Sequence, residues 1–123
     1  QSISSNAGLA KRRFIVQNLQ LFLLLEKAKA DCGSGGTIPI LYFYPDKYYC
    51  SDCAVQAAAL DTAANECKNV RVFALPTDLG IPVIGVLVQK YSVQYYPSLV
   101  IGGAKHEGIV SPAQLRQLTG CGQ

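Results

Sequence analysis

The sequence has few charges and only one histidine, and these scarcities exclude several classes of protein. Charged residues make up 15% of the chain and the net charge is +3, so no basic stripe of the kind that binds nucleic acid is present. The single histidine, His106, excludes a histidine-rich metal site. The longest apolar run, Phe14 to Leu25, is interrupted by three amide side chains and is too short to span a bilayer. We therefore predict no nucleic-acid partner, no metal and no other cofactor.

Methionine is also absent, and the first residue is Gln1. We expect residues 1–7 to be an expression scar or a disordered tail, and any signal peptide or membrane anchor to lie upstream of them. The remaining length suits a single domain, because the chain has 123 residues in all and 50% of them are hydrophobic. This composition excludes an intrinsically disordered chain.

Hydrophobic periodicity predicts one long helix followed by alternating strands and helices. Apolar residues recur at helical spacing over residues 8–31, which predicts an N-terminal amphipathic helix. Short β-branched and aromatic runs predict strands at residues 37–44, 70–75 and 98–101, and residues 105–110 are predicted as the second strand of a hairpin. The segments between and after them predict helices at residues 50–67, 80–91 and 113–119. The glycine pair at 102–103 predicts a hairpin turn. The sequence thus predicts an α/β domain at residues 36–121, with a mixed four-stranded sheet flanked by helices.

One motif carries the chemistry. Cys50-Ser51-Asp52-Cys53 follows a predicted buried strand by a short loop and opens a helix. A helix N-terminus favours an anion, so we expect the Cys50 thiolate to be stabilised there. Cys53 lies one turn later, within reach of a mixed disulfide on Cys50. The spacing predicts reversible dithiol–disulfide exchange with Cys50 attacking and Cys53 resolving. An inert structural pair and half of a metal site are the alternatives.

From Thr37 to Thr119 the sequence resembles the thioredoxin superfamily. That family has an aromatic residue before its CxxC motif, where Tyr49 stands, and a cis-proline loop facing the motif, where Tyr96-Pro97-Ser98 stands. The resemblance implies a thioredoxin-like fold in which the N-terminal amphipathic helix takes the place of the usual first strand. It also implies that an extended substrate peptide pairs with the backbone beside Cys50. Tyr49, Tyr96 and Pro97 are therefore candidate substrate-binding residues.

The sequence also departs from the family's pattern. The central strand carries no carboxylate in Leu41-Tyr42-Phe43-Tyr44, Ala58 replaces a helix proline, and Ser51-Asp52 replaces Gly-Pro. Two function hypotheses stay open for this reason. The first is a thiol–disulfide oxidoreductase acting on protein or peptide cysteines. The second is a non-catalytic thioredoxin-like binding module of a larger membrane-associated or secreted protein, which would hold its partner through tyrosines around the motif.

The other three cysteines bear on the cellular compartment. Five cysteines without zinc-site spacing favour an extracytoplasmic or secreted protein, membrane-anchored as one option, with the cytoplasm as the alternative. The thioredoxin-like fold implies that Cys32, Cys67 and Cys121 all lie at the end opposite the CxxC motif. It places Cys67 and Cys121 at the ends of helices on the same sheet face. We favour these two as a structural disulfide, with Cys32 as the alternative partner of either.

Overall fold

The computed structural model describes residues 3–32 and 37–121, and the chain divides into two units, residues 1–35 and 36–123. The described part of the first unit is one long helix, α1 (Ile3–Cys32). It begins at Ile3 rather than at Gly8, because nothing between these residues breaks a helix. Residues 3–7 are therefore helical, in place of the disordered tail that was one of the two expectations. The origin of residues 1–7 as an expression scar stays a prediction.

The second unit contains the predicted sheet. Its strands are β1 (Ile38–Tyr44), β2 (Val70–Pro76), β3 (Ser98–Ile101) and β4 (Ala104–Glu107), in the spatial order β2-β1-β3-β4. β1 is parallel to β2 and antiparallel to β3, and β3 is antiparallel to β4. The mixed α/β fold predicted from the sequence is confirmed, with a helix preceding the first strand as expected.

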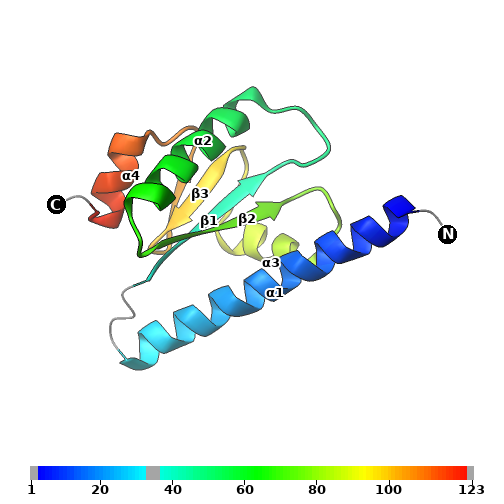
Figure 1. Cartoon of the computed structure of the whole chain (residues 1–123), viewed down its shortest axis with the longest axis horizontal. Coiled ribbons are helices and arrows are strands. Elements are labelled where there is room, and N and C mark those ends of the chain that lie inside the picture. Colours follow the sequence, from blue (N-terminus) through cyan, green and yellow to red (C-terminus); the bar gives the residue numbers. More distant parts are fainter. Residues whose placement is uncertain (1–2, 33–36, 122–123) are drawn as a thin grey trace. The chain divides into compact units, whose positions relative to one another are not determined.

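Helices cover both faces of this sheet. In Figure 1, α2 (Ser51–Glu66) and α4 (Pro112–Thr119) lie on one face, and α3 (Pro82–Lys90) lies on the other. Successive side chains of a strand point to opposite faces, and the interior of β1 is buried at every position from Pro39 to Phe43. On the α2 and α4 face, Ile40, Leu99 and Leu115 are fully buried in one apolar cluster. β1 is thus a central strand that needs apolar residues on both sides.

The connections follow local backbone rules. Gly102 and Gly103 have φ angles of 59° and 81°, which a two-residue hairpin turn requires. Ser111 caps α4 with a capping box through Gln114. β4 ends at Glu107, so the prediction of a strand to Val110 was wrong for its last part. Gly108 has a φ of 88°, which lies outside the β region, although its N–H still donates to Pro97 O at 2.9 Å.

Among the residues that the structure describes, no helix combines the length and the apolar character needed to cross a membrane.

Candidate active site

Cys50 and Cys53 form a disulfide at the start of α2, with their Cα atoms 5.1 Å apart. Cys50 is the N-cap of α2 and has extended backbone angles, whereas Cys53 lies within the first turn. The Cys53 backbone N–H donates to Cys50 Sγ at 3.1 Å, so the sulfur of Cys50 occupies the place of a capping oxygen. A thiolate formed on Cys50 would receive this same N–H, which favours the charged form.

The two cysteines of this disulfide differ in exposure. Cys50 is partly exposed, whereas Cys53 is only 6% exposed. An incoming thiol therefore reaches Cys50 more readily than Cys53. The catalytic roles assigned to the two residues stay predictions.

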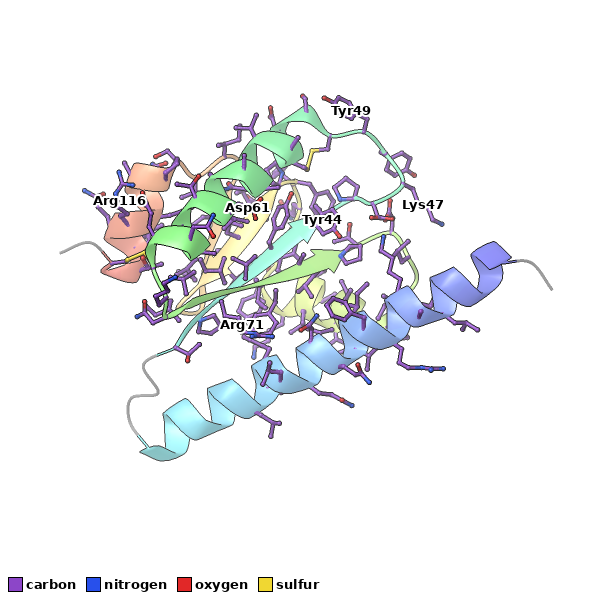
Figure 2. All side chains as sticks on the ribbon, in the orientation of Figure 1. Tyr44, Lys47, Tyr49, Asp61, Arg71 and Arg116 are labelled. Atoms are coloured by element: carbon purple, nitrogen blue, oxygen red, sulfur yellow. A yellow bond between two sulfur atoms is a disulfide. The ribbon has the colours of Figure 1, made fainter. Side chains whose placement is uncertain are left out.

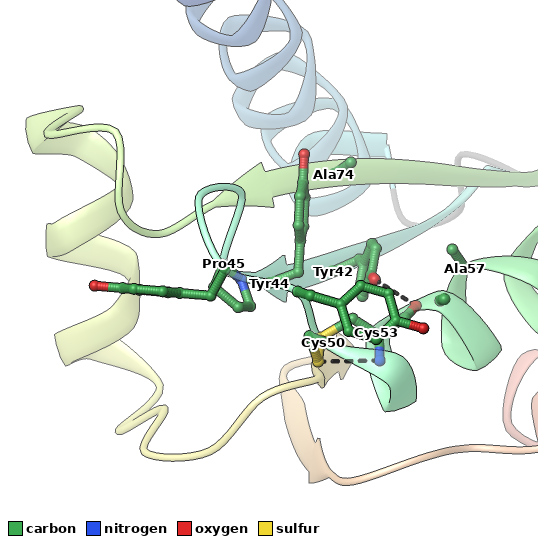
Figure 3. Close-up of a pocket in the computed structure, with 10 residues that line it drawn as sticks. Tyr42, Tyr44, Pro45, Cys50, Cys53, Ala57 and Ala74 are labelled. Carbon is green, nitrogen blue, oxygen red and sulfur yellow. Dashed lines mark hydrogen bonds between the residues drawn. A yellow bond between two sulfur atoms is a disulfide. The ribbon is translucent and has the colours of Figure 1, made fainter.

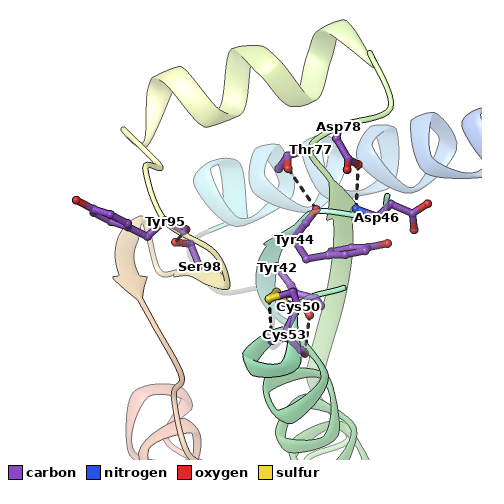
Figure 4. Close-up of a disulfide and its surroundings, with 9 residues drawn as sticks. All are labelled: Tyr42, Tyr44, Asp46, Cys50, Cys53, Thr77, Asp78, Tyr95 and Ser98. Carbon is purple, nitrogen blue, oxygen red and sulfur yellow. Dashed lines mark hydrogen bonds between the residues drawn. A yellow bond between two sulfur atoms is a disulfide. The ribbon is translucent and has the colours of Figure 1, made fainter. Parts of the chain in front are cut away.

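The loop that carries Cys50 is anchored by residues that follow β2. Asp78 accepts two backbone N–H groups through its carboxylate, from Asp46 at 2.9 Å and from Lys47 at 2.8 Å. Thr77 donates its N–H to Tyr44 O at 2.9 Å. Figure 4 shows Thr77 and Asp78 above the disulfide in that view. Sequence reasoning missed this anchor. The available signal was a Thr-Asp pair directly after a strand parallel to β1, because parallel strands end at the same edge of a sheet.

The hydroxyl of a buried tyrosine on β1 binds the first turn of α2. The hydroxyl of Tyr42 on β1 donates to Cys53 O at 2.8 Å, and its ring stacks on Tyr44 with centroids 5.0 Å apart. Burial, followed by the charge that Tyr44 would carry, raises the pKa of Tyr42 to about 12. The phenol is therefore a proton-bearing hydrogen-bond donor at neutral pH. Sequence reasoning noted only that this strand lacks an acid.

A groove of about 380 Å³ opens beside the disulfide. Tyrosines 42, 44, 48 and 49 form much of its wall, and Cys50 and Cys53 lie along it (Figure 3). The small side chains of Ala54, Ala57 and Ala74 line the rest, together with Pro45. Tyr49 is 89% exposed and Tyr48 70% exposed, so these two form the outer rim.

The Tyr96-Pro97 loop lies at the same end of the sheet as the cysteine pair. Ser98 is paired with Phe43, so the residues just before β3 meet the carboxyl end of β1, from which the chain runs to Cys50. Figure 4 shows Tyr95 and Ser98 in the surroundings of the disulfide. The Tyr96-Pro97 bond is cis, as the resemblance implied. Pro97 is buried and Tyr96 is 38% exposed.

The three predicted substrate-binding residues do not all line the groove. Tyr49 lines the groove with Cys50, whereas Tyr96 and Pro97 do not line it. The groove thus lies beside the disulfide, and the cis-proline loop lies at the same end of the sheet. The substrate-binding roles of all three residues stay predictions.

A second disulfide joins Cys67 and Cys121, with Cα atoms 6.0 Å apart. Cys67 is the C-cap of α2 and Cys121 follows α4, so this bond lies at the opposite end of α2 from Cys50 (Figure 2). Cys32, the alternative partner, is the last residue of α1. Arg116 on α4 and Glu66 on α2 form an ion pair of 3.2 Å near the same end.

Comparisons with known proteins agree with this arrangement at the level of structure. No protein-family model matches the sequence, and no curated protein is significantly similar to it. Among solved structures, chloroplastic thioredoxin z is 26% identical with a TM-score of 0.59, over 79% of this chain and 85% of that one. Thioredoxin-2 of the malaria parasite, a component of its protein secretion machinery, is 21% identical with a TM-score of 0.58, over 68% and 82%. Thioredoxin O2 from Arabidopsis thaliana is 22% identical with a TM-score of 0.54, over 76% and 79%.

Proposed function

Since this chain belongs by its fold to the thioredoxin-like superfamily, we propose that it is a thiol–disulfide oxidoreductase acting on the cysteines of proteins or peptides. The observation that carries the proposal is the disulfide at the start of α2, with the Cys53 amide donating to Cys50 Sγ. A bond placed there can open into a stabilised thiolate and close again without moving the helix.

The oxidised protein oxidises a dithiol substrate in two exchange steps. A substrate thiolate attacks Cys50 Sγ, the Cys50–Cys53 bond breaks, and Cys53 leaves as the thiolate. The second substrate thiolate then attacks the substrate sulfur of this mixed disulfide, and Cys50 leaves as the thiolate. The substrate loses two electrons and gains a disulfide, and the protein gains the same two electrons. The reverse sequence reduces a substrate disulfide.

Burial determines which cysteine takes part in the mixed disulfide. Cys53 is 6% exposed and is held by the Tyr42 hydroxyl at its carbonyl. Cys50 is partly exposed and lies at the helix end, where the backbone N–H groups favour a thiolate. We therefore assign attack to Cys50 and resolution to Cys53. We assign the binding of the substrate polypeptide to Tyr49, Tyr96 and Pro97.

Reduction of a model protein disulfide tests the proposal. With dithiothreitol as the electron donor, the protein is expected to accelerate the reduction of insulin disulfides, measured by the precipitation of the free chains. Cys50→Ser should abolish the acceleration, and Cys53→Ser should trap a mixed disulfide with the substrate that mass spectrometry detects. Cys32→Ser is the control and should keep the activity. Equal rates for the Cys50→Ser variant and the unaltered protein would rule out this function.

A non-catalytic binding module is the second candidate, and exposed aromatic side chains favour it. Tyr48, Tyr49 and Tyr95 are 70%, 89% and 65% exposed around the disulfide, where they can contact a partner protein. The same experiment separates the two functions, since a binding module would form complexes without turning over disulfides.

We place the protein in an extracytoplasmic or secreted compartment. The Cys67–Cys121 disulfide supports this, because structural disulfides persist in oxidising compartments. Alkylation of free thiols in intact cells, followed by mass spectrometry, tests it. Protection of Cys67 and Cys121 is expected, and full alkylation of both would place the protein in the cytoplasm.

A further inference from the structure

The groove beside the disulfide is lined by both large and small side chains. Tyr42 and Tyr44 stack nearly parallel, with 20° between their ring planes. Ala57 of α2 and Ala74 of β2 also line the groove and leave space that larger side chains would fill. Ala74 lies directly beside Tyr42 in the register of the two parallel strands. Aromatic side chains and small residues beside them together leave room for a flat or branched apolar group.

The lining of the groove carries no charged residue. It consists of four tyrosines, three alanines, two cysteines and one proline. A charged group placed against this surface would lose water without gaining an ion pair, which is unfavourable. An uncharged aliphatic or aromatic group would instead remove apolar surface from water on both sides. The lining thus favours an uncharged group in the groove over a charged one.

The exchange reaction places the substrate polypeptide next to the groove. Cys50 itself lines the groove, so a substrate polypeptide joined to Cys50 Sγ has its neighbouring residues at the groove mouth. We propose that the groove binds an uncharged aliphatic or aromatic side chain that flanks the reacting cysteine of the substrate polypeptide. This inference rests on the proposed function and adds a preference of substrate. The tether makes binding intramolecular once the mixed disulfide has formed, so even a modest contact has a large effect.

A series of dithiol peptides tests the preference. The peptides share one sequence and differ only in the residue beside the first cysteine, which is Phe, Leu, Ser, Lys or Glu. The rate constant for their oxidation by the oxidised protein is measured in single-turnover experiments, relative to that for dithiothreitol, which has no side chain to occupy the groove. The Phe and Leu peptides are expected to react about tenfold faster than the Ser and Glu peptides.

Charge introduced into the groove should change this order. Ala74 is exposed on the edge strand β2, so Ala74→Glu and Ala74→Lys preserve the core. Ala74→Glu should slow the Phe peptide about tenfold and favour the Lys peptide over the Glu peptide, and Ala74→Lys should do the opposite. Ala58→Glu is the matched control, because Ala58 is exposed on α2 and does not line the groove. It should leave the order of the peptides unchanged.

Each outcome bears on one of the two proposals. Equal rates for all peptides, or an unchanged order in both Ala74 variants, would overturn the groove assignment while the exchange function stands. A groove occupied by a second copy of this chain would appear as self-association that Ala74→Glu abolishes, and this too would overturn the groove assignment.

If the protein oxidises neither the peptides nor dithiothreitol, the proposed exchange function is wrong. The groove is then tested by titrating a peptide with serine for cysteine. Chemical-shift changes at Tyr42 and Ala57 that only the Phe and Leu forms cause would support an apolar site, and their absence would refute it.

Discussion

The carboxamide of Gln56 pairs with both backbone polar groups of Val110. Gln56 Nε2 donates to Val110 O at 3.0 Å, and Val110 N donates to Gln56 Oε1 at 2.7 Å. Gln56 is fully buried on α2, and Val110 lies between β4 and α4, where no strand partner satisfies its backbone. The side chain thus substitutes for a strand and joins α2 to the segment that leads into α4.

Replacement of Gln56 by Leu should destabilise the protein by about 2–4 kcal/mol, because both backbone groups of Val110 would be buried without a partner. The measurement is the free energy of unfolding from urea titration. Gln117→Leu is the control, because Gln117 is exposed on α4, and it should cost less than about 0.5 kcal/mol. Equal effects of the two substitutions would show that the Gln56 pairing contributes nothing.

Tyr42→Phe removes the hydroxyl that holds the carbonyl of Cys53 and keeps the ring. The amide of Cys53 that faces Cys50 Sγ should become less well fixed, so the pKa of the Cys50 thiol in the reduced protein should rise. Thiolate absorbance of the reduced protein measures this. Tyr44→Phe keeps the hydroxyl of Tyr42 and is the control. A Cys50 pKa unchanged in Tyr42→Phe would contradict the role given to the hydroxyl.

The raised pKa of Tyr42 predicts a loss of stability at high pH. Burial, with the Tyr44 charge, raises the pKa of Tyr42 from 10.0 to about 12 in the folded protein. The folded state therefore holds this proton where the unfolded chain releases it, so the stability that Tyr42 contributes is complete below pH 10 and falls as the pH rises towards 12. Free energies of unfolding between pH 9 and 12 should decline less in Tyr42→Phe than in the unaltered protein. Parallel declines would contradict the assignment.

The lowered pKa of Asp78 predicts a loss of stability in acid. Burial alone would raise the pKa of Asp78, but the N–H groups of Asp46, Lys47 and Asp78 itself, with the Lys47 charge, hold this pKa below its ordinary value of 3.8. The stability contributed by this carboxylate is present above pH 3.8 and is lost as the pH falls through the lowered pKa. Asp78→Asn should be less stable at pH 7, and the difference should shrink below pH 3.8. Asp61→Asn, at an exposed position on α2, is the control.

The Cys67–Cys121 disulfide closes a loop with a sequence separation of 54. Its removal in Cys67→Ser with Cys121→Ser should destabilise the protein by about 4 kcal/mol, because the unfolded chain regains the freedom of that loop. Chemical denaturation of the oxidised proteins measures this, and Cys32→Ser is the control. Non-reducing peptide mapping should recover a 67–121 pair. A pair that contains Cys32 would instead support the alternative partner.

Local rules account for the parts of the fold that the sequence predicted. The CxxC motif at a helix start, the glycine pair of the β3–β4 hairpin and the Ser111 cap each depend on residues a few positions apart. The apolar run of β1 likewise predicted a strand buried on both faces. β4 shows the limit of such patterns, because the hairpin strand was predicted to continue to Val110, whereas the register of β3 and β4 ends at Glu107. A positive φ angle, which the sequence pattern does not show, ends the strand.

The surroundings of the cysteine pair depend on contacts between distant residues. The sequence by itself determined the element order, the CxxC pair and the helix end that it caps. Only the tertiary structure decided that Tyr42 donates to Cys53, that Asp78 anchors the loop before Cys50, and that Ala57 and Ala74 line one groove with the tyrosines. The reason is physical, since strand register and helix docking together determine which distant side chains meet, and the residues that meet lie far apart in the sequence.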